Sequence, residues 1–252
     1  AQTENLRLLQ LTWAGADKYT RMENLPQSVV LANASGAFGT IIAEYAIGSL
    51  VALYRSFGRY WSNKQAHIWQ KYDHAETISG KTALVLGMGD IGANVARRLK
   101  VFGAAVLGVK RTAVSAVPAD FDEAHTLDAL DALLPRADIV IGCLPNTRET
   151  AGLLTAERLH AMKAGAVLVN VGRGSLAGTD DLVSALQDGH LGGAALDVFE
   201  TEPLPADCPL WDMENVLLTP HIAGPSFGGS ADVQNTIWHI CMDNLERYLT
   251  GN

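Results

Sequence analysis

Arg173 stands between two glycines in the segment VNVGRGSL, where an apolar, strand-like run gives way to a loop. A surface arginine needs no glycines beside it, whereas an arginine that meets a small anionic substrate needs that free space. Its planar guanidinium suits a carboxylate and an adjacent oxygen. Taken alone, the residue could equally be one half of a surface ion pair. The pattern predicts an anion site at the end of a strand and leaves that alternative open.

A glycine-rich turn, LVLGMGDIGANVARRL, places Gly87, Gly89 and Gly92 in the pattern G-x-G-x-x-G. It follows an apolar run and opens a helical pattern, which is the context that a dinucleotide-binding turn requires. Gly87 permits the tight turn, Gly89 lets the backbone approach a pyrophosphate, and Gly92 allows close helix packing. Asp90 and Ile91 open the helix, whose free amides and dipole favour phosphate. A tight turn without a ligand is the alternative.

The second strand-like run ends in Lys110, Arg111 and Thr112. NAD sites usually carry a carboxylate here, about 20 positions after the glycines. Two cations and a hydroxyl take its place, and arginine binds phosphate through paired hydrogen bonds. We therefore predict NADP(H) as the preferred cofactor and NAD(H) as the second choice. A solvated basic turn is the competing interpretation.

Apolar runs alternate with helical patterns from residue 77 onward. Most of the runs are continuous, as expected of parallel strands buried on both faces. Six of them are predicted strands, at 82–87, 105–110, 138–145, 166–172, 193–199 and 215–220. The predicted fold class is α/β, a doubly wound parallel sheet of the Rossmann type, in which ligands bind beyond the carboxyl ends of the strands.

The two ends of the chain predict a second, smaller unit. NLRLLQLTWAGADKY reads as a strand entering a glycine turn, and residues 40–64 read as one long helix. The final segment reads as an amphipathic helix, with apolar positions at Val233, Ile237, Ile240 and Leu245. We predict a partial substrate domain over 1–40 and 226–252 and a dinucleotide-binding domain over 41–225.

The 252-residue chain has a net charge of −8 and a sequence pI near 5.3, which argues against a partner that is a nucleic acid or another polyanion. Its three cysteines, Cys143, Cys208 and Cys241, are widely spaced and odd in number, so we expect no disulfide framework. No apolar run reaches the roughly 18 residues of a membrane helix. We expect a cytoplasmic protein with no signal peptide, no membrane contact and no metal site.

Four ordered motifs, GMGDIG, VNVGRGSL, GAALDVFETEPLP and NVLLTPHIAGPSFGG, together resemble the D-isomer-specific 2-hydroxyacid dehydrogenase family. The similarity extends from LTWAGADKY to about Gly224. It implies that Arg173 binds the substrate's carboxylate and keto oxygen, that His221 exchanges a proton with that oxygen, and that Glu202 is the carboxylate partner of the histidine. The chemistry agrees, because hydride transfer to a 2-oxo acid creates an alkoxide that needs a proton donor, and a carboxylate keeps the histidine charged.

The same resemblance implies further contacts. The backbone amides of Ala14 and Gly15, in the turn WAGAD, would bind the substrate carboxylate. Leu144 and Pro145 would pass beside the ribose and nicotinamide of the cofactor. Asp197 is placed with the cofactor site, although it could instead tune the histidine or cap a turn.

Family members usually begin with further strand–helix units before the segment LRLLQLTWAGAD, and this chain does not show them. Either part of the native protein is missing from the sequence, or packing on a partner subunit compensates for the small substrate domain. The helix that contains residues 43–57 is apolar on more than one face. We expect it to pack against its twin in a two-fold homodimer, as the resemblance also implies.

These observations predict a D-specific oxidoreductase that transfers a hydride between NADP(H) and a small 2-oxo or 2-hydroxy acid such as glyoxylate, hydroxypyruvate or pyruvate. Oxidation of formate or phosphite is an alternative within the superfamily. Glu202 stands where formate dehydrogenases carry an amide, which argues against formate but not against phosphite. A cofactor-sensing interaction protein is the alternative from another class, since dehydrogenase-like co-repressors keep the same three residues.

Overall fold

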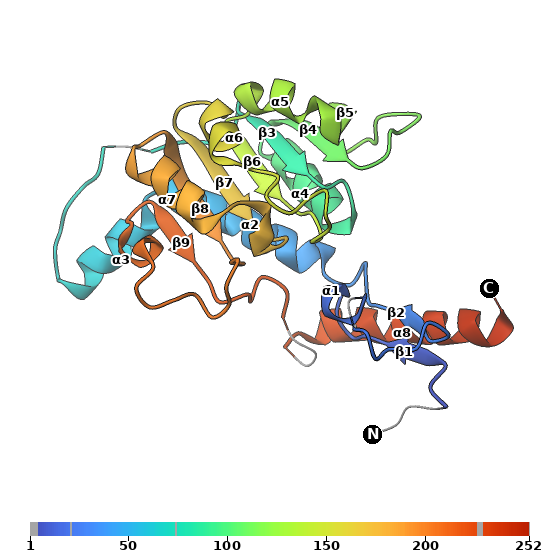
Figure 1. Cartoon of the computed structure of the whole chain (residues 1–252). Helices are drawn as coiled ribbons and strands as arrows, with labels where there is room; N and C mark the ends of the chain where they lie inside the picture. The colour runs from blue at the N-terminus through green and yellow to red at the C-terminus, as the bar shows by residue number, and fades with distance from the viewer. Residues whose placement is uncertain (1–4, 21, 74, 226–228, 252) are drawn as a thin grey trace. The chain divides into compact units, whose positions relative to one another are not determined.

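The computed structural model describes residues 5–251 except 21, 74 and 226–228, and it divides into two compact units (Figure 1). The larger unit spans residues 40–223, and the smaller one combines residues 1–39 with 224–252. The boundary that we predicted at 225/226 adjoins residues 226–228, which belong to the motif NVLLTPHIAGPSFGG and lie outside the described residues.

The larger unit is built on a seven-stranded sheet in which every neighbouring pair is parallel. Its strands pair in the order β5-β4-β3-β6-β7-β8-β9. They are β3 (Thr82–Leu86), β4 (Ala105–Lys110), β5 (Glu123–Thr126), β6 (Ile139–Gly142), β7 (Ala166–Asn170), β8 (Leu191–Leu196) and β9 (Val216–Leu218). The chain order reverses between β3 and β6, which is the point where doubly wound sheets bind their ligands. The predicted fold class is confirmed.

All six predicted strands form, but the seventh, β5, was not predicted. Its sequence, EAHT, has no apolar run, and all four residues are only partly buried at the edge of the sheet. An edge strand buries less side-chain surface than a central one, so its sequence lacks the continuous apolar signal on which the prediction depended.

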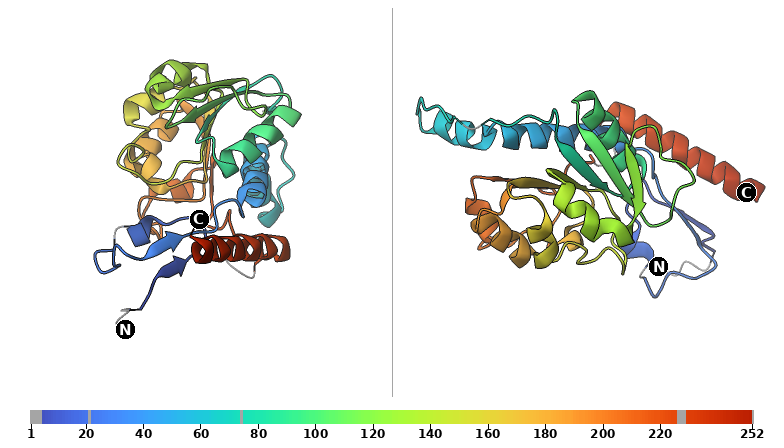
Figure 2. Two further views of the ribbon diagram at one scale, coloured as in Figure 1. Left: turned by 90° about the vertical axis from the view of Figure 1, so that its right-hand side faces the viewer. Right: turned by 90° about the horizontal axis from the view of Figure 1, so that it is seen from above.

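Helices cover both faces of this sheet, with α2 and α4 on one side and α5, α6 and α7 on the other (Figures 1 and 2). The helices are α2 (Gly39–Tyr54), α3 (Phe57–Gln65), α4 (Asp90–Val101), α5 (Leu130–Leu133), α6 (Ala156–Ala161) and α7 (Thr179–Gln187). Short 3₁₀ turns lie at η1 (Leu127–Ala129), η2 (Leu134–Arg136), η3 (Gly174–Leu176) and η4 (Pro209–Asp212).

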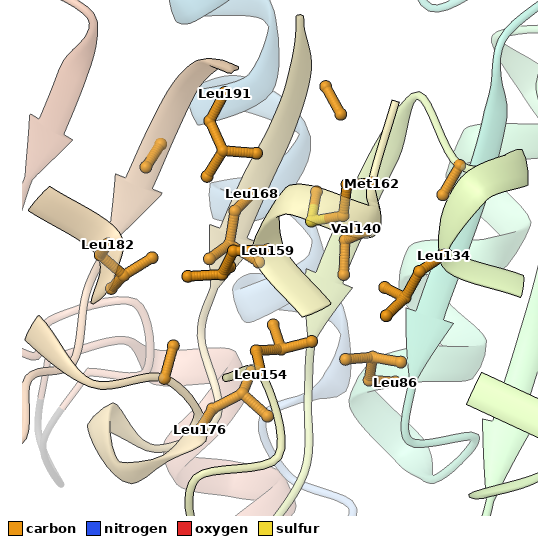
Figure 3. Packing of buried hydrophobic residues seen from close by; sticks show 14 of the residues in the cluster. Leu86, Leu134, Val140, Leu154, Leu159, Met162, Leu168, Leu176, Leu182 and Leu191 are labelled. Carbon is orange, nitrogen blue, oxygen red and sulfur yellow. The ribbon is translucent and has the colours of Figure 1, made fainter. Parts of the chain in front are cut away.

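The layer between the sheet and α5–α7 holds a continuous hydrophobic core. Figure 3 shows how strand residues meet helix residues there, and all of them are at least nine-tenths buried: Leu86, Val140, Leu168, Leu134, Leu159 and Leu182. Full burial of one such side chain stabilises the fold by about 1.5–3 kcal/mol. This core fixes the carboxyl ends of β3, β6, β7 and β8, from which several loops of the candidate site extend.

The prediction of one long helix over residues 40–64 was wrong, because the run is broken between α2 and α3. Ser56 has a φ of 53°, in the left-handed region, and its amide donates to the carbonyl of Leu53 at 3.0 Å. Ile42, Ala46 and Leu50 on α2 are buried, whereas α3 has no buried residue. The apolar face that holds α2 against the sheet does not continue past Tyr54, so packing no longer imposes one helical axis.

The smaller unit contains a two-stranded parallel sheet, β1 (Leu8–Gln10) with β2 (Val30–Ala32), the short α1 (Asp17–Thr20) and the 20-residue α8 (Ala231–Thr250). The Asn244 side chain on α8 donates to the side chain of Gln10 at 3.0 Å. Val233 and Ile237 are buried as predicted, but Leu245 is 38% exposed, on a side of the helix that this unit leaves uncovered. None of the helices in the described ranges is long and apolar enough to cross a membrane.

Candidate active site

The glycine loop between β3 and α4 lies at the switch point of the sheet. The surroundings that would receive a side chain differ among its three glycines. Gly87 has a φ of 106°, and a Cβ on it would lie 2.9 Å from the carbonyl oxygen of Cys143. A Cβ on Gly92 would lie 1.8 Å from the carbonyl oxygen of Gly87. A Cβ on Gly89 would meet nothing within 4 Å. Protein packing therefore requires glycine at positions 87 and 92 but not at position 89.

Open space at Gly89 fits a dinucleotide. Gly89 is the N-cap of α4, and no side chain makes a capping hydrogen bond there. The first amides of the helix, at Asp90 and Ile91, thus face that space with the positive end of the helix dipole. A pyrophosphate is the group that such a cradle suits, so the predicted phosphate-binding residues fit a nicotinamide dinucleotide.

The glycines beside Arg173 bring neighbouring loops onto its backbone. A Cβ on Gly172 would lie 2.7 Å from the carbonyl oxygen of Leu144, and a Cβ on Gly174 would lie 1.9 Å from the carbonyl carbon of Phe199. Our explanation that these glycines clear space for a substrate was therefore incomplete. They let the loops after β6 and β8 pack against the loop that carries Arg173. This packing fixes the position of the Arg173 backbone.

Asn170, the last residue of β7, holds the backbone on both sides of this turn and was missed by the sequence analysis. It is 2% exposed. Its side-chain amide donates to the carbonyl of Arg173 at 2.9 Å, and its side-chain oxygen accepts the amide of Gly172 at 3.2 Å. The Arg173 guanidinium is half-buried and donates to the Gly172 carbonyl at 2.8 Å. A polar residue at the end of an otherwise apolar strand was the signal that could have identified Asn170.

His221 and Glu202 form a direct pair, as predicted from the resemblance. The imidazole Nδ1 lies 2.9 Å from Oε2 of Glu202, while Oε1 of Glu202 accepts the amide of Phe199 at 3.0 Å. The side chains of the pair are 48% and 38% exposed. Within the described residues, Nε2 of His221 makes no hydrogen bond, so this nitrogen is available to a substrate.

Electrostatics at Glu202 keep it ionised. Partial burial raises the pKa of its carboxyl, but the hydrogen bonds from His221 and from the Phe199 amide, together with the positive charge of Arg173, outweigh that effect. The net result is a pKa below the usual range of a glutamate. The positive charge of Arg173 thus acts on the same carboxylate that pairs with His221, which links the three residues predicted to be catalytic.

Asp197, at the end of β8, is buried and holds the loop that carries His221. It is 2% exposed, and its carboxylate accepts hydrogen bonds from the Thr219 hydroxyl at 2.6 Å and from the amides of Ile222 and Ala223 at 2.8 and 2.9 Å. Its carbonyl accepts the amide of His221 at 2.8 Å. This geometry favours the turn-capping alternative over direct contact with the cofactor.

The remaining predicted residues lie in three places. Lys110 ends β4, with Arg111 and Thr112 exposed just beyond it, and the side chains of these three residues make no hydrogen bond or ion pair with the rest of the described chain. Leu144 is buried at the start of the loop after β6, and Pro145 is exposed beside it. Ala14 and Gly15 belong to the smaller unit, between β1 and α1, where the carbonyl of Ala14 accepts the Asn33 side-chain amide at 2.7 Å. Their contact with a substrate stays a prediction.

A sequence model of the NAD-binding domain of the D-isomer specific 2-hydroxyacid dehydrogenases matches residues 47–223. The chain belongs to this family. The predicted enzyme class, an NAD(P)-dependent D-2-hydroxyacid dehydrogenase, is therefore confirmed, and so is the nicotinamide cofactor.

Similar proteins have a consistent chemistry. The glyoxylate reductase of Thermofilum pendens is 34% identical, over 98% of this chain and 73% of its own length. A D-isomer specific 2-hydroxyacid dehydrogenase from Xanthobacter autotrophicus Py2, solved with NADPH and MES, has a TM-score of 0.85 at 34% identity, covering 99% of this chain and 76% of its own. An NADPH-dependent glyoxylate/hydroxypyruvate reductase from Sinorhizobium meliloti, solved with NADP and sulfate, has a TM-score of 0.84 at 30% identity, covering 98% and 76%.

Proposed function

We propose that this dehydrogenase reduces small 2-oxo acids of the glyoxylate and hydroxypyruvate type to 2-hydroxy acids, of D configuration where the product is chiral, and prefers NADPH as the reductant. The observation that carries the proposal is the hydrogen bond between His221 and Glu202, with the Arg173 guanidinium close to the same carboxylate. These groups provide a proton donor, its stabilising anion and a cation for an anionic substrate.

When bound, the cofactor supplies the hydride that reduces the keto carbon. Reduction leaves negative charge on the substrate oxygen, and His221 delivers a proton to it through Nε2, the ring nitrogen that Glu202 does not engage. The ionised carboxylate of Glu202 favours the protonated imidazole, and its bond to Nδ1 fixes the ring orientation. A positioned general acid of this kind contributes about 10²–10⁴-fold to the rate.

Arg173 orients the substrate in this proposal. Its guanidinium can donate to both the carboxylate and the keto oxygen of a 2-oxo acid, which aligns the keto group with His221. The hydrogen bonds of Asn170 and the packing of Gly172 and Gly174 hold the arginine's backbone in place before substrate arrives.

Preference for NADPH is supported by the residues at the end of β4. Arg111 and Thr112 are exposed and are not engaged by other described residues, so both can meet a 2′-phosphate. The Xanthobacter and Sinorhizobium relatives were solved with NADPH and NADP, respectively. A carboxylate, which would repel the phosphate, does not occur among residues 110–112.

A panel of substrates with NADPH tests the proposal. Glyoxylate, hydroxypyruvate and pyruvate are offered with NADPH, and formate and phosphite are offered with NADP⁺. We expect turnover with at least one 2-oxo acid, and the D-isomer as the product wherever that acid is hydroxypyruvate or pyruvate, because glycolate has no stereocentre. Oxidation of phosphite alone would replace the proposal with that activity, and tight NADPH binding without any turnover would favour a cofactor-sensing protein.

A further inference from the structure

His221 adopts a backbone conformation that its neighbours must enforce. Its φ is 57°, in the left-handed region, where the backbone of a residue with a side chain is strained. Such a residue keeps its conformation only when the surrounding contacts determine it. Three of those contacts are hydrogen bonds to Asp197, from the amides of residues 221, 222 and 223. Whatever fixes Asp197 therefore also fixes the proposed acid.

A chain of hydrogen bonds connects Asp197 to helix α2. The Thr219 hydroxyl donates to Oδ1 of Asp197 at 2.6 Å, because a carboxylate in this position accepts. The same Thr219 oxygen is hydrogen-bonded to the Tyr45 hydroxyl. Thr219 has a single hydroxyl proton, which is already given to Asp197, so Tyr45 must be the donor. The direction of the whole chain is thus set, from Tyr45 through Thr219 to Asp197.

The Tyr45 hydroxyl is suited to a donor role over a wide pH range. Burial raises the pKa of Tyr45, its hydrogen bonds to Thr219 and Ser49 lower it, and the negative charge of Asp197 raises it, with a net increase above the usual value. A phenol with a raised pKa keeps its proton at neutral and moderately alkaline pH. Tyr45 therefore remains a donor throughout the range in which a histidine acid is useful.

We propose that Tyr45 is a positioning residue for His221, holding the loop of residues 219–223 through Thr219 and Asp197. This inference rests on the proposed role of His221 as the acid. Tyr45 lies on α2, 176 positions before His221 in the sequence. Its hydroxyl attaches the loop after β9 to α2, so the position of the imidazole follows that of the helix.

The chain offers a matched control on the same helix. Tyr54 is 7% exposed and its hydroxyl makes no hydrogen bond among the described residues, so Tyr54→Phe removes a phenol oxygen from α2 without breaking a hydrogen bond. Tyr45→Phe removes the terminal donor of the chain and leaves the ring. Comparing the two separates the hydrogen bond from the general effect of losing a hydroxyl group on α2.

Hydrogen exchange at the amides of Ile222 and Ala223 reports on the loop without any substrate. In Tyr45→Phe we expect both amides to exchange about 5- to 10-fold faster, the change that corresponds to one lost hydrogen bond, with no change in Tyr54→Phe. We also expect kcat for the best 2-oxo acid to fall by about 5- to 10-fold while KM for NADPH stays constant. Thr219→Val should reproduce both effects, and Thr219→Ser, which keeps the hydroxyl, should restore both.

The outcomes are distinct. Unchanged exchange at Ile222 and Ala223 in Tyr45→Phe overturns the inference, whatever the activity. Faster exchange with an unchanged kcat also overturns it, because the loop would then move without consequence for the acid. Faster exchange in a protein whose wild-type form reduces no 2-oxo acid keeps the hydrogen-bond chain but refutes the proposed function, and with it the link to catalysis.

Discussion

Glu202 binds Nδ1 of His221 at 2.9 Å and leaves Nε2 as the ring nitrogen that faces outward. The tautomer and the orientation of the imidazole are both set by this one contact, because the carboxylate accepts and Nδ1 must therefore donate. The loop of residues 219–223 sets the position of the ring, and Glu202 sets its direction.

Glu202→Gln should move the alkaline limb of the pH profile for 2-oxo acid reduction to lower pH. Since the pKa of Glu202 is lowered by His221, by the Phe199 amide and by Arg173, the carboxylate is ionised throughout the working range. Its charge favours the protonated imidazole, so its removal lets the acid lose its proton at a lower pH. Initial rates measured across the pH range provide the check.

Glu200→Gln is the matched control for that experiment. Glu200 lies two residues away and accepts the amide of Thr179 at 2.6 Å, a bond that a glutamine oxygen can also accept. Its pH profile should match that of the wild type. A Glu202→Gln profile with the same alkaline limb as both would show that the pair does not control the acid.

Gly89→Ala and Gly92→Ala should separate cofactor binding from folding. A Cβ at position 92 would lie 1.8 Å from the Gly87 carbonyl, so Gly92→Ala should lower the free energy of unfolding by about 1–3 kcal/mol, as overpacking does. A Cβ at position 89 meets no protein atom within 4 Å, so Gly89→Ala should fold normally and bind NADPH more weakly. Chemical denaturation and NADPH titration measure the two effects. Normal NADPH affinity in Gly89→Ala would move the pyrophosphate away from this loop.

Arg111→Ala should remove much of the preference for NADPH over NADH. Charge-assisted hydrogen bonds contribute roughly 1.5–3 kcal/mol each, so one such contact to the 2′-phosphate implies about 10- to 100-fold discrimination in kcat/KM. The variant should weaken NADPH and spare NADH, and added salt should weaken NADPH more than NADH. Arg97→Ala is the control, because it removes a cation of α4 that is paired with Asp120. An unchanged ratio in Arg111→Ala would return residues 110–112 to the interpretation as a solvated basic turn.

The protein should be a homodimer, with an interface centred on α3 and the segment that follows. The apolar residues of α2 from which we predicted the dimer are largely buried within the chain itself, whereas Trp61 is 66% exposed and Trp69 98% exposed. Residues 55–72 carry four cations and no carboxylate, in a chain of net charge −8, so they suit a second copy's acidic surface.

Light scattering at micromolar concentration measures the assembly. We expect about twice the chain mass of 26.9 kDa for the wild type and a shift toward the single mass for Trp69→Ser. Val101→Ser, at an 83% exposed apolar position on α4, should leave the dimer intact. A wild-type mass equal to one chain would contradict the homodimer.

The central strands and the glycine loop could be predicted because their signals are local. Continuous apolar runs mark buried parallel strands, and the spacing of Gly87, Gly89 and Gly92 is meaningful once a strand precedes it and a helix follows. The edge strand β5 and the break at Ser56 gave no such signal. At Ser56 the helical pattern continues in the sequence, while the packing that would support it ends.

The supporting residues of the site could not be predicted from spacing. Three of them, Asn170, Thr219 and Tyr45, act through partners that only folding brings near. Tyr45 and Thr219, for example, are hydrogen-bonded although they are 174 positions apart in the sequence. In the sequence, each of them is a single polar residue next to apolar residues, and such a pattern does not predict a role in the site. The catalytic residues, in contrast, lie in motifs whose joint order is specific.

Comparing the rates of 2-oxo acid reduction by the wild type and by His221→Ala tests whether His221 is the proton donor. NADPH oxidation is followed with glyoxylate and hydroxypyruvate. His160→Ala is the control, because His160 lies outside the site and its imidazole pairs with the Asp188 carboxylate at 2.8 Å. We predict wild-type turnover, the same turnover in His160→Ala, and a kcat lower by about 10²–10⁴-fold in His221→Ala with NADPH affinity unchanged. Near-normal turnover in His221→Ala would show that His221 is not the proton donor, and no turnover with either acid in the wild type would show that the protein does not reduce them.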